Sequence, residues 1–240
     1  MNDTIERFLI VNADDFGAGS LINRGIIESH GRGIVTSTSL LVDFPGSEHA
    51  ARLGRATPTL GVGLHVCLTS EGGHPLFDFD DAERCGSEVV RQFERFVALM
   101  DRLPTHLDTH HNVHRNARVL PHMLALATRH ALPMREHSEA RYFPDFFGQW
   151  DGVTHPEQIS TANLVDMLGA MGSGITELGC HPGYIDPDFP TSYAVERELE
   201  LQTLCDPAVR QFLSDTDIRL ITFSNITRVS GDQGPAQRSL

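Results

Sequence analysis

Phe8-Leu9-Ile10-Val11-Asn12-Ala13-Asp14-Asp15-Phe16-Gly17 is the stretch of this sequence from which the fold follows most directly. Phe8 to Ala13 is a short apolar run, which is typical of a β-strand buried on both faces. Two adjacent carboxylates, Asp14 and Asp15, come directly after it. Folds of the α/β class place their active sites at the carboxyl ends of such strands. The stretch therefore predicts a buried strand with acidic site residues at its end.

Similar apolar segments recur along the chain and alternate with segments of helical periodicity. The further predicted strands are, in chain order, Ile34–Val42, Leu60–Val66, Thr105–His110, Leu132–Arg135, Ile175–Cys180 and Ile218–Phe223. Alternating strands and helices predict a parallel sheet. Polar residues follow many of these strands, which favours a (β/α) barrel over an open sheet with one or two switch points. We expect one α/β domain, barrel-like and with about seven strands, over residues 1–230, followed by a polar tail over residues 231–240.

The composition excludes several classes of function. A formal net charge of −13 argues against a nucleic-acid-binding protein and against docking on anionic membranes. The chain contains no lysine, which excludes Schiff-base catalysis and the P-loop lysine. Acid/base or metal chemistry on a neutral or cationic small substrate remains.

The cysteines and the N-terminus predict a cytoplasmic protein. The four cysteines are widely spaced and form no CxxC pair, which is typical of reduced thiols. The first residues do not resemble a signal peptide, and no apolar stretch approaches the length of a membrane span.

A second stretch, His106–His114, contains four histidines and one carboxylate. If Thr105–His110 is a strand, its alternation places His106, Asp108 and His110 on one face. Unpaired polar side chains are costly to bury, so this face suits a metal site or an acid/base site. The alternative is a polar strand end with solvated histidines.

Asp15, His65 and His110 together would form a two-histidine, one-carboxylate site with open positions, as catalytic divalent ions require. Two imidazoles favour Zn²⁺, with Fe²⁺, Mn²⁺ or Mg²⁺ as alternatives. Such an ion lowers the pKa of bound water from 15.7 towards roughly 7. Asp14 would then take the proton of the water, and His181 would protonate the leaving amine.

Each of these residues also has a structural interpretation. The Asp14-Asp15 pair is compatible with a helix cap or with solvated carboxylates. A lone His65 is compatible with a hydrogen-bonded core histidine, and His181 precedes Pro182 and is compatible with a turn. The combination favours a site, because every candidate falls at a predicted strand end.

From about Phe8 to Phe223 the chain resembles the YdjC-like (ChbG-type) carbohydrate deacetylases. The segments that carry the resemblance are IVNADDFG (10–17), GIVTST (33–38), GLHVCLT (63–69), PTHLDTHH (104–111) and CHPGY (180–184). NADDFG together with the histidine-rich run is highly specific. Asn112 is a departure, because relatives tend to have a third histidine there.

The resemblance implies a distorted TIM-like barrel and the metal-dependent hydrolysis of an N-acetyl group from an amino sugar. It implies that Asp15, His65 and His110 hold one divalent ion, with Asp14 as base and His181 as acid. The ion implied is Mg²⁺, whereas the histidine-rich ligand set suits Zn²⁺.

The remaining predicted site residues surround this centre. We expect His106 and Asp108 to orient His110. We expect His111 and His114 to line the cleft. Arg135 should lie at the site as a substrate-binding or supporting residue.

Two other functions stay open at this stage. A metal-dependent phosphoesterase is less well supported, because the sequence shows no cationic residue to clamp a phosphate beyond Arg135. A non-catalytic metal- or sugar-binding protein is the other alternative. The segment Tyr142–His155, which contains Trp150, is predicted as an aromatic loop that either stacks on a sugar ring or covers the barrel or a homodimer interface.

Overall fold

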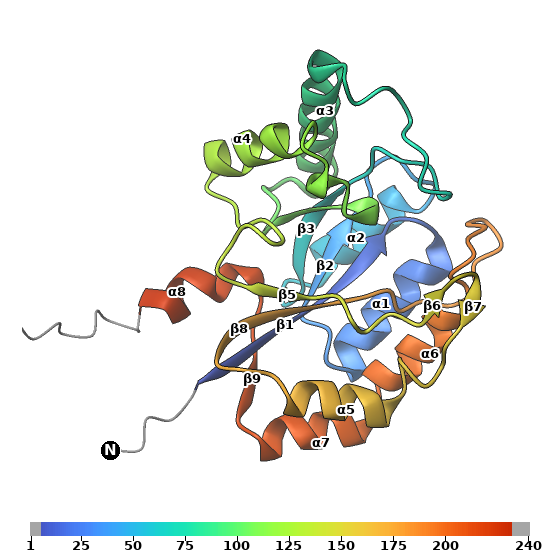
Figure 1. Cartoon of the computed structure of the whole chain (residues 1–240), viewed down its shortest axis with the longest axis vertical. Coiled ribbons are helices and arrows are strands. Elements are labelled where there is room, and N and C mark those ends of the chain that lie inside the picture. The colour runs from blue at the N-terminus through green and yellow to red at the C-terminus, as the bar shows by residue number, and fades with distance from the viewer. Residues whose placement is uncertain (1–5, 232–240) are drawn as a thin grey trace, which may run out of the picture.

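The computed structural model describes residues 6–231, and at its centre is a curled sheet of parallel strands (Figure 1). The seven strands of this sheet are, in chain order, β1 (Arg7–Phe16), β2 (Ser37–Leu40), β3 (Gly61–Val66), β4 (Leu107–Thr109), β5 (Arg141–Phe143), β8 (Gly174–Cys180) and β9 (Ile218–Leu220). Their spatial order is β4-β3-β2-β1-β8-β5, and β9 also pairs with β1. Every pairing between these strands is parallel. The sheet forms a half-barrel, which confirms the predicted α/β fold and its distorted TIM-like architecture.

The apolar run of β1 makes it the central strand. One edge of β1 pairs with β8, and the other edge is shared by β9 and β2. Successive side chains of a strand point to opposite faces. Leu9, Val11 and Ala13 accordingly belong to the main hydrophobic core, and Phe8 and Ile10 belong to a smaller core on the other face. Burial on both faces explains why the sequence of this strand is a continuous apolar run.

The face of β1 that carries Phe8 and Ile10 becomes polar towards its carboxyl end. Asn12 and Asp14 follow on the same alternation, and Asn12 Nδ2 donates a hydrogen bond to Asp14 Oδ1 at 2.8 Å. One strand therefore supplies both an apolar floor and the polar groups above it.

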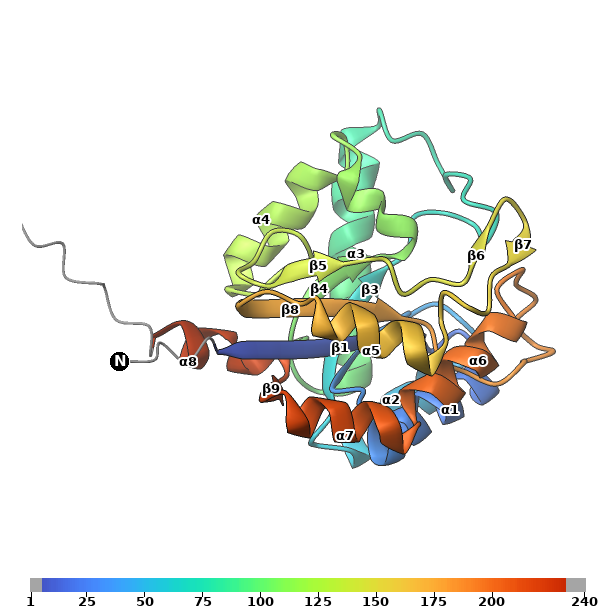
Figure 2. The ribbon, with the colours of Figure 1, turned by 60° about the horizontal axis from the view of Figure 1, so that its bottom comes forward.

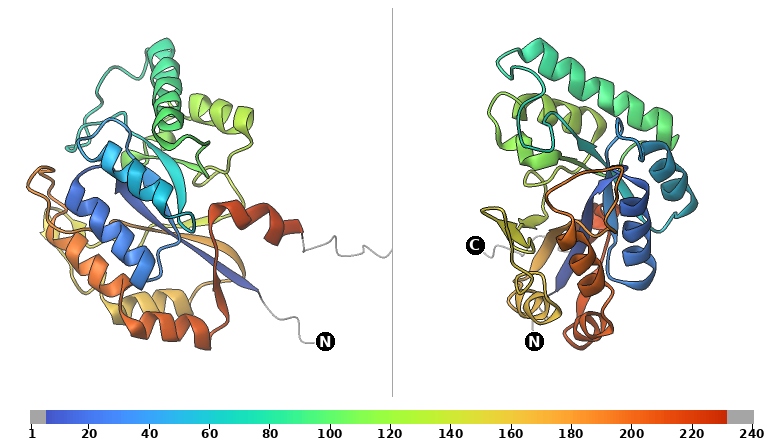
Figure 3. Two further views of the ribbon diagram at one scale, coloured as in Figure 1. Left: turned by 180° about the vertical axis from the view of Figure 1, so that it is seen from behind. Right: turned by 90° about the vertical axis from the view of Figure 1, so that its right-hand side faces the viewer.

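Eight α-helices of the described residues surround the sheet (Figures 2 and 3). They are α1 (Ser20–Arg32), α2 (Ser47–Ala56), α3 (Ala82–Met100), α4 (Leu120–His130), α5 (Thr161–Gly169), α6 (Val195–Leu204), α7 (Pro207–Asp215) and α8 (Ile226–Gly231). The longest, α3, buries Val89, Phe93, Phe96 and Met100, which recur at helical spacing. Helices α1 and α2, α1 and α6, α3 and α4, and α5 and α7 pack against one another.

The predicted strand Thr105–His110 is wrong at its end. β4 stops at Thr109, and the chain continues as a 3₁₀ turn, η1 (His110–Arg115). Within η1, His111 and Asn112 have left-handed φ values of 54° and 51°. The period-2 alternation therefore stops before His110, which reaches the site from a turn and not from the strand.

The predicted strand Leu132–Arg135 is also wrong. The segment makes only an isolated bridge, from Met134 to Leu107. The strand that joins the sheet instead is β5, which overlaps the start of the predicted aromatic loop Tyr142–His155. That segment also forms a hairpin, β6 (Gln149–Trp150) and β7 (Val153–Thr154). Asp151 and Gly152 turn it with φ values of 53° and 72°, and an Asp-Gly pair is typical of such two-residue turns.

The predicted polar tail lies outside the described residues, apart from Gly231. Among residues 6–231, no helix has the length and apolar character that crossing a membrane requires.

Candidate active site

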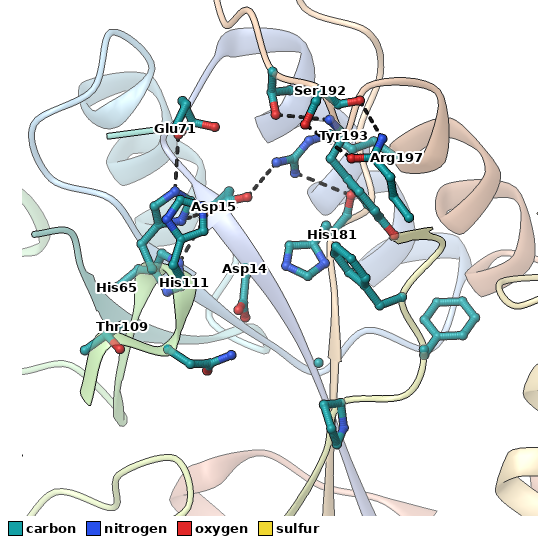
Figure 4. Close-up of a pocket in the computed structure, with 18 of the residues that line it drawn as sticks. Asp14, Asp15, His65, Glu71, Thr109, His111, His181, Ser192, Tyr193 and Arg197 are labelled. Carbon is teal, nitrogen blue, oxygen red and sulfur yellow. Dashed lines mark hydrogen bonds and ion pairs between the residues drawn. The ribbon is translucent and has the colours of Figure 1, made fainter. Parts of the chain in front are cut away.

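The polar ends of the strands open into a pocket of about 430 Å³ (Figure 4). The predicted site residues that line it are Asp14, Asp15, His65, His110, His111 and His181. They come from β1, β3, η1 and the segment after β8. Residues far apart in the sequence meet here because the carboxyl ends of parallel strands lie at one edge of the sheet.

Asp14 and Asp15 both reach the pocket because the end of β1 is irregular. The register of its pairing with β2 shifts between Ala13 and Phe16, and Asp15 has a left-handed φ of 67°. On a regular strand these neighbours would point to opposite faces. The irregularity turns the second carboxylate into the pocket, at a conformational cost of about 1–3 kcal/mol.

Asp15, His65 and His110 are arranged as a divalent ion would require. One potential ligand atom of each lies within 4.8 Å of the others, and all three residues are buried. Asp15 Oδ1 is 3.1 Å from His110 Nδ1 and 3.4 Å from His65 Nε2, yet it makes no hydrogen bond of good geometry. Asp15 Oδ2 accepts a hydrogen bond from Arg197 Nη2 at 2.6 Å. A buried carboxylate oxygen without a hydrogen bond, facing two imidazoles, fits a metal ligand set.

Asp108 holds His65 from the side away from Asp15. Its Oδ1 lies 2.7 Å from His65 Nδ1. Burial alone would lower the pKa of His65, but Asp108 and the other nearby carboxylates outweigh burial and raise it to about 10. The expectation that Asp108 orients His110 is therefore wrong. Asp108 and His65 are direct partners in the β3–β4 register, which brings these two side chains together.

Arg135 holds Asp14 through both carboxylate oxygens. Its Nη1 lies 2.7 Å from Oδ2 and its Nη2 lies 2.8 Å from Oδ1. Burial raises the pKa of Asp14, and the Arg135 guanidinium outweighs burial, so that the pKa lies below its usual value. Arg135 is 1% exposed and is not among the residues that line the pocket. It supports Asp14 and is not placed to contact a substrate.

Arg135 also binds two more carboxylates. Its Nε donates to Glu177 Oε1 at 2.6 Å, and its Nη2 lies 3.2 Å from Asp108 Oδ2. Burial raises the pKa of Glu177 to about 7, against the opposing effect of Arg135. Asp14, His65 and Asp108 form a second group with ligand atoms within 4.8 Å of one another. Because Arg135 already pairs with both of its carboxylates, this group is a poorer metal site.

His181 lies across the pocket from His65 and His111 (Figure 4). The side chain is 25% exposed, and its Nδ1 lies 3.8 Å from Glu200 Oε1 on α6. Glu200 is fully buried; its Oε2 accepts from the backbone N–H of His181, and its Oε1 accepts from the Tyr193 hydroxyl. The Tyr193 hydroxyl accepts in turn from the backbone N–H of Gly148 at 2.9 Å. Glu200 thereby fixes the position of His181.

Two of the predicted histidines do not reach the pocket. His106 is fully buried and stacks on Phe223 with ring centroids 3.8 Å apart. His114 is also fully buried and contacts Thr109 Oγ1 at 2.7 Å and Glu136 Oε2 at 2.9 Å. The expectation that His114 lines the cleft and that His106 orients His110 is therefore wrong. A short strand followed by a turn directs both side chains into the interior.

His111 does line the pocket, and its Nδ1 lies 2.9 Å from Thr69 Oγ1. Burial and the neighbouring His110 lower the pKa of His111 to about 4.

The rest of the lining includes Asn112, residues of the predicted aromatic segment Tyr142–His155, and residues that the sequence patterns did not single out. Those with polar or aromatic side chains include Glu71, Asn112, Tyr142, Phe146, Phe147, Gln149, Tyr193 and Arg197. Phe147 stacks on Tyr193 with centroids 4.6 Å apart and forms part of an aromatic wall. Trp150 does not line the pocket and stacks instead on His155. Their positions depend on loops and on α6, for which no local motif gives a signal.

Sequence comparison finds similarity over nearly the whole chain. A family model described as YdjC-like protein matches residues 8–215. A carbohydrate deacetylase of Geobacillus stearothermophilus is 37% identical over 90% of this chain and 97% of its own length. A chitooligosaccharide deacetylase of Klebsiella pneumoniae is 34% identical over 92% of this chain and its own full length.

Two solved structures share the fold of this chain. A putative cellobiose-phosphate cleavage protein of Enterococcus faecalis superposes with a TM-score of 0.78 at 29% identity, covering 92% of this chain and 98% of its own. A family 4 carbohydrate esterase of Streptomyces lividans, in complex with acetate, has a TM-score of 0.55 at 13% identity, covering 91% of this chain and 93% of its own. At that identity the second likeness concerns the fold alone.

Proposed function

This chain belongs to the YdjC-like protein family, and from that membership and its pocket we propose that it is a metal-dependent hydrolase that removes the N-acetyl group from an acetylated amino sugar. The observation that carries the proposal is the pocket itself, which joins Asp15, His65 and His110 to Asp14 and His181. Its relatives at 31–37% identity are named carbohydrate or chitooligosaccharide deacetylases. The enzyme class is therefore that of a carbohydrate deacetylase.

Asp15, His65 and His110 are the residues that would hold the ion. A divalent ion bound there supplies Lewis acidity, which makes water a stronger acid and a carbonyl a better electrophile. Two imidazoles and one carboxylate suit Zn²⁺ better than Mg²⁺, which prefers oxygen ligands. Mg²⁺ is the ion implied by the family resemblance, and the metal content of the purified protein decides between them.

Asp14 is the proposed general base. Its carboxylate remains ionised at neutral pH because Arg135 opposes the effect of burial on its pKa. It accepts the proton of the attacking water as the oxygen adds to the acetyl carbon. Arg135 fixes its orientation through both oxygens.

His181 is the proposed general acid. It lies on the opposite side of the pocket from His65 and His111 (Figure 4). It donates a proton to the amine nitrogen as the carbon–nitrogen bond breaks, so that acetate and the free amino sugar leave. Each such proton transfer contributes typically about 10²–10⁴-fold to the rate.

The pocket wall formed by Phe147 and Tyr193 supports a sugar as the substrate. Flat aromatic faces pack well against the C–H faces of a pyranose ring, and Gln149 and Asn112 offer amides for its hydroxyl groups.

The phosphoesterase alternative is less well supported. The arginine that lines the pocket, Arg197, is bound to Asp15, and Arg135 behind the pocket is bound to Asp14 and Glu177. Neither guanidinium is free to clamp a phosphate.

The experiment is an acetate-release assay on N-acetylglucosamine oligomers, with the purified protein, with a chelator, and after addition of Zn²⁺ or Mg²⁺. We expect acetate release that the chelator abolishes and one ion restores. Sugar binding without acetate would support the non-catalytic alternative. Acetate release that is insensitive to the chelator would refute the proposed metal dependence.

A further inference from the structure

His65 and His110 are each placed between Asp15 and a second carboxylate. His65 turns Nε2 towards Asp15 Oδ1, at 3.4 Å, and Nδ1 towards Asp108 Oδ1, at 2.7 Å. His110 turns Nδ1 towards the same Asp15 oxygen, at 3.1 Å, and Nε2 towards Glu71 Oε1, at 3.2 Å. Each imidazole thus has a carboxylate beside both of its nitrogens, although they come from a strand and a turn. The contact of His65 with Asp108 is a hydrogen bond, whereas Glu71 lies beside His110 Nε2 without a hydrogen bond of good geometry.

We propose that Glu71 is a positioning residue for the metal site, the outer carboxylate that orients His110 as Asp108 orients His65. A carboxylate beside the outer nitrogen fixes which nitrogen carries the proton, holds the ring, and increases the basicity of the inner nitrogen. His110 therefore presents Nδ1 to the ion, and His65 presents Nε2. The inference rests on the metal proposed above for Asp15, His65 and His110.

The segment that contains Glu71 is a turn held by backbone hydrogen bonds. The backbone N–H of Ser70 donates to the carbonyl of His74 at 2.9 Å, and that of Leu76 donates to the carbonyl of Leu68 at 2.9 Å. Thr69, two residues before Glu71, contacts His111 Nδ1 at 2.9 Å. The turn after β3 therefore makes one side-chain contact with each of the two consecutive histidines of η1, and Figure 4 shows Glu71 and His111 on the same side of the pocket.

Glu71 is not placed as a ligand itself. No carboxylate oxygen of Glu71 falls within the group of atoms that Asp15, His65 and His110 bring within 4.8 Å of one another. Its ion pair within the described residues is with the outer nitrogen of His110, at the edge of the pocket. Its effect on the ion must then pass through His110.

Glu71 is also the better of the two outer carboxylates to test. Asp108 is fully buried and pairs with Arg135 as well, so its replacement would leave a buried charge unpaired and disturb folding. The side chain of Glu71 is 30% exposed, and exposed ion pairs contribute little to stability. Loss of Glu71 can therefore change the metal site while the fold is kept.

The test compares Zn²⁺ affinity, by isothermal titration calorimetry, for the wild-type protein, Glu71→Gln, Glu71→Ala and the control Glu94→Gln on the exposed face of α3. We expect the Kd to rise about 10–100-fold in Glu71→Ala. Glu71→Gln keeps a hydrogen-bond acceptor without the charge and should show a smaller rise. Glu94→Gln should match the wild type, and the melting temperature of the metal-free protein should be the same in all four.

A second readout reports on geometry. In Co²⁺-substituted protein the visible absorption bands should shift in Glu71→Ala and stay unchanged in Glu94→Gln. An unchanged Kd and spectrum in Glu71→Ala would overturn the inference and leave the proposed function in place. A wild-type protein that binds no divalent ion would overturn the proposed function itself, so the two failures are distinguishable.

Discussion

One guanidinium holds both oxygens of Asp14: Arg135 Nη1 lies 2.7 Å from Oδ2 and Nη2 lies 2.8 Å from Oδ1. This two-point contact fixes the plane of the carboxylate at the edge of the pocket. Burial by itself would favour protonated Asp14, and the contact with Arg135 reverses that effect. The proposed base is therefore ionised and oriented before a substrate arrives.

Replacing Asp14 should separate proton transfer from metal binding. In Asp14→Asn we expect kcat to fall by about 10²–10⁴-fold, because the amide cannot accept the proton of the attacking water. Zn²⁺ affinity should stay near the wild-type value, since Asp14 is not one of the proposed ligands. Acetate release and calorimetric Zn²⁺ titration on the same samples measure the two effects. Loss of Zn²⁺ binding would instead make Asp14 a ligand, and unchanged kcat would place the base elsewhere.

Glu200 should affect turnover more than substrate binding. It accepts from the backbone of His181 and lies 3.8 Å from the His181 ring nitrogen, without lining the pocket. In Glu200→Gln we expect kcat to fall about 100-fold with KM little changed, because the proposed acid loses the group that orients it. Steady-state kinetics on one acetylated oligosaccharide measure both constants. Glu198→Gln, on the same helix, is the matched control. A rise in KM with unchanged kcat would contradict the positioning role.

Glu177 should make the folding stability depend on pH. Its pKa of about 7 in the folded protein exceeds the ordinary value of 4.5, so the folded state binds more protons between these two values. The free energy of unfolding must then fall as pH rises from about 4.5 to 7, by on the order of 3 kcal/mol. In Glu177→Gln this contribution is absent.

Urea unfolding at several pH values measures this effect. The free energy of unfolding of the wild type minus that of Glu177→Gln should fall by that amount as pH rises through that window, whatever its starting value. Glutamine resembles the protonated carboxyl, so the variant lacks both the titration and the pH-dependent ion pair with Arg135. Parallel curves for the two proteins would show that Glu177 keeps an ordinary pKa.

The sequence predicts most of the sheet, because its strands are apolar runs whose character is local. Phe8–Ala13 and Ile175–Cys180 lie within β1 and β8, side by side in the structure. The prediction of a strand at Leu132–Arg135 is wrong because strand pairing depends on residues far away in the sequence. Met134 pairs with Leu107 in a single bridge, whereas Arg141–Phe143 pairs with β8. Short strands of three residues carry no periodicity that the sequence can reveal.

The candidate site shows the same difference between residues marked by local sequence and residues placed by distant partners. Asp14, His65 and His181 lie at or just after the ends of apolar runs, and the structure brings all three to one pocket. Glu71 and Glu200 lie on a turn and a helix, where an acidic residue is ordinary, so only the fold singles them out. Glu177 could have been noticed, because a charged residue inside an apolar strand requires a buried partner. His106 and His114 belong to the histidine-rich run but face the interior.

Gly63 should be the most sensitive glycine of β3, because it faces the imidazole of His106. A Cβ at position 63 would lie 2.4 Å from His106 Cε1, and that ring cannot move away since it stacks on Phe223. We expect Gly63→Ala to lower the free energy of unfolding by about 1–3 kcal/mol. Gly31→Ala is the matched control: on α1, a Cβ at position 31 meets no atom within 4 Å. There alanine should stabilise the protein by about 0.5–1 kcal/mol, through helix propensity and a less flexible unfolded chain. Urea unfolding of the two variants and the wild type measures both changes. Equal stabilities for Gly63→Ala and the wild type would show that His106 has room to move, and would remove the close approach as the reason for a glycine there.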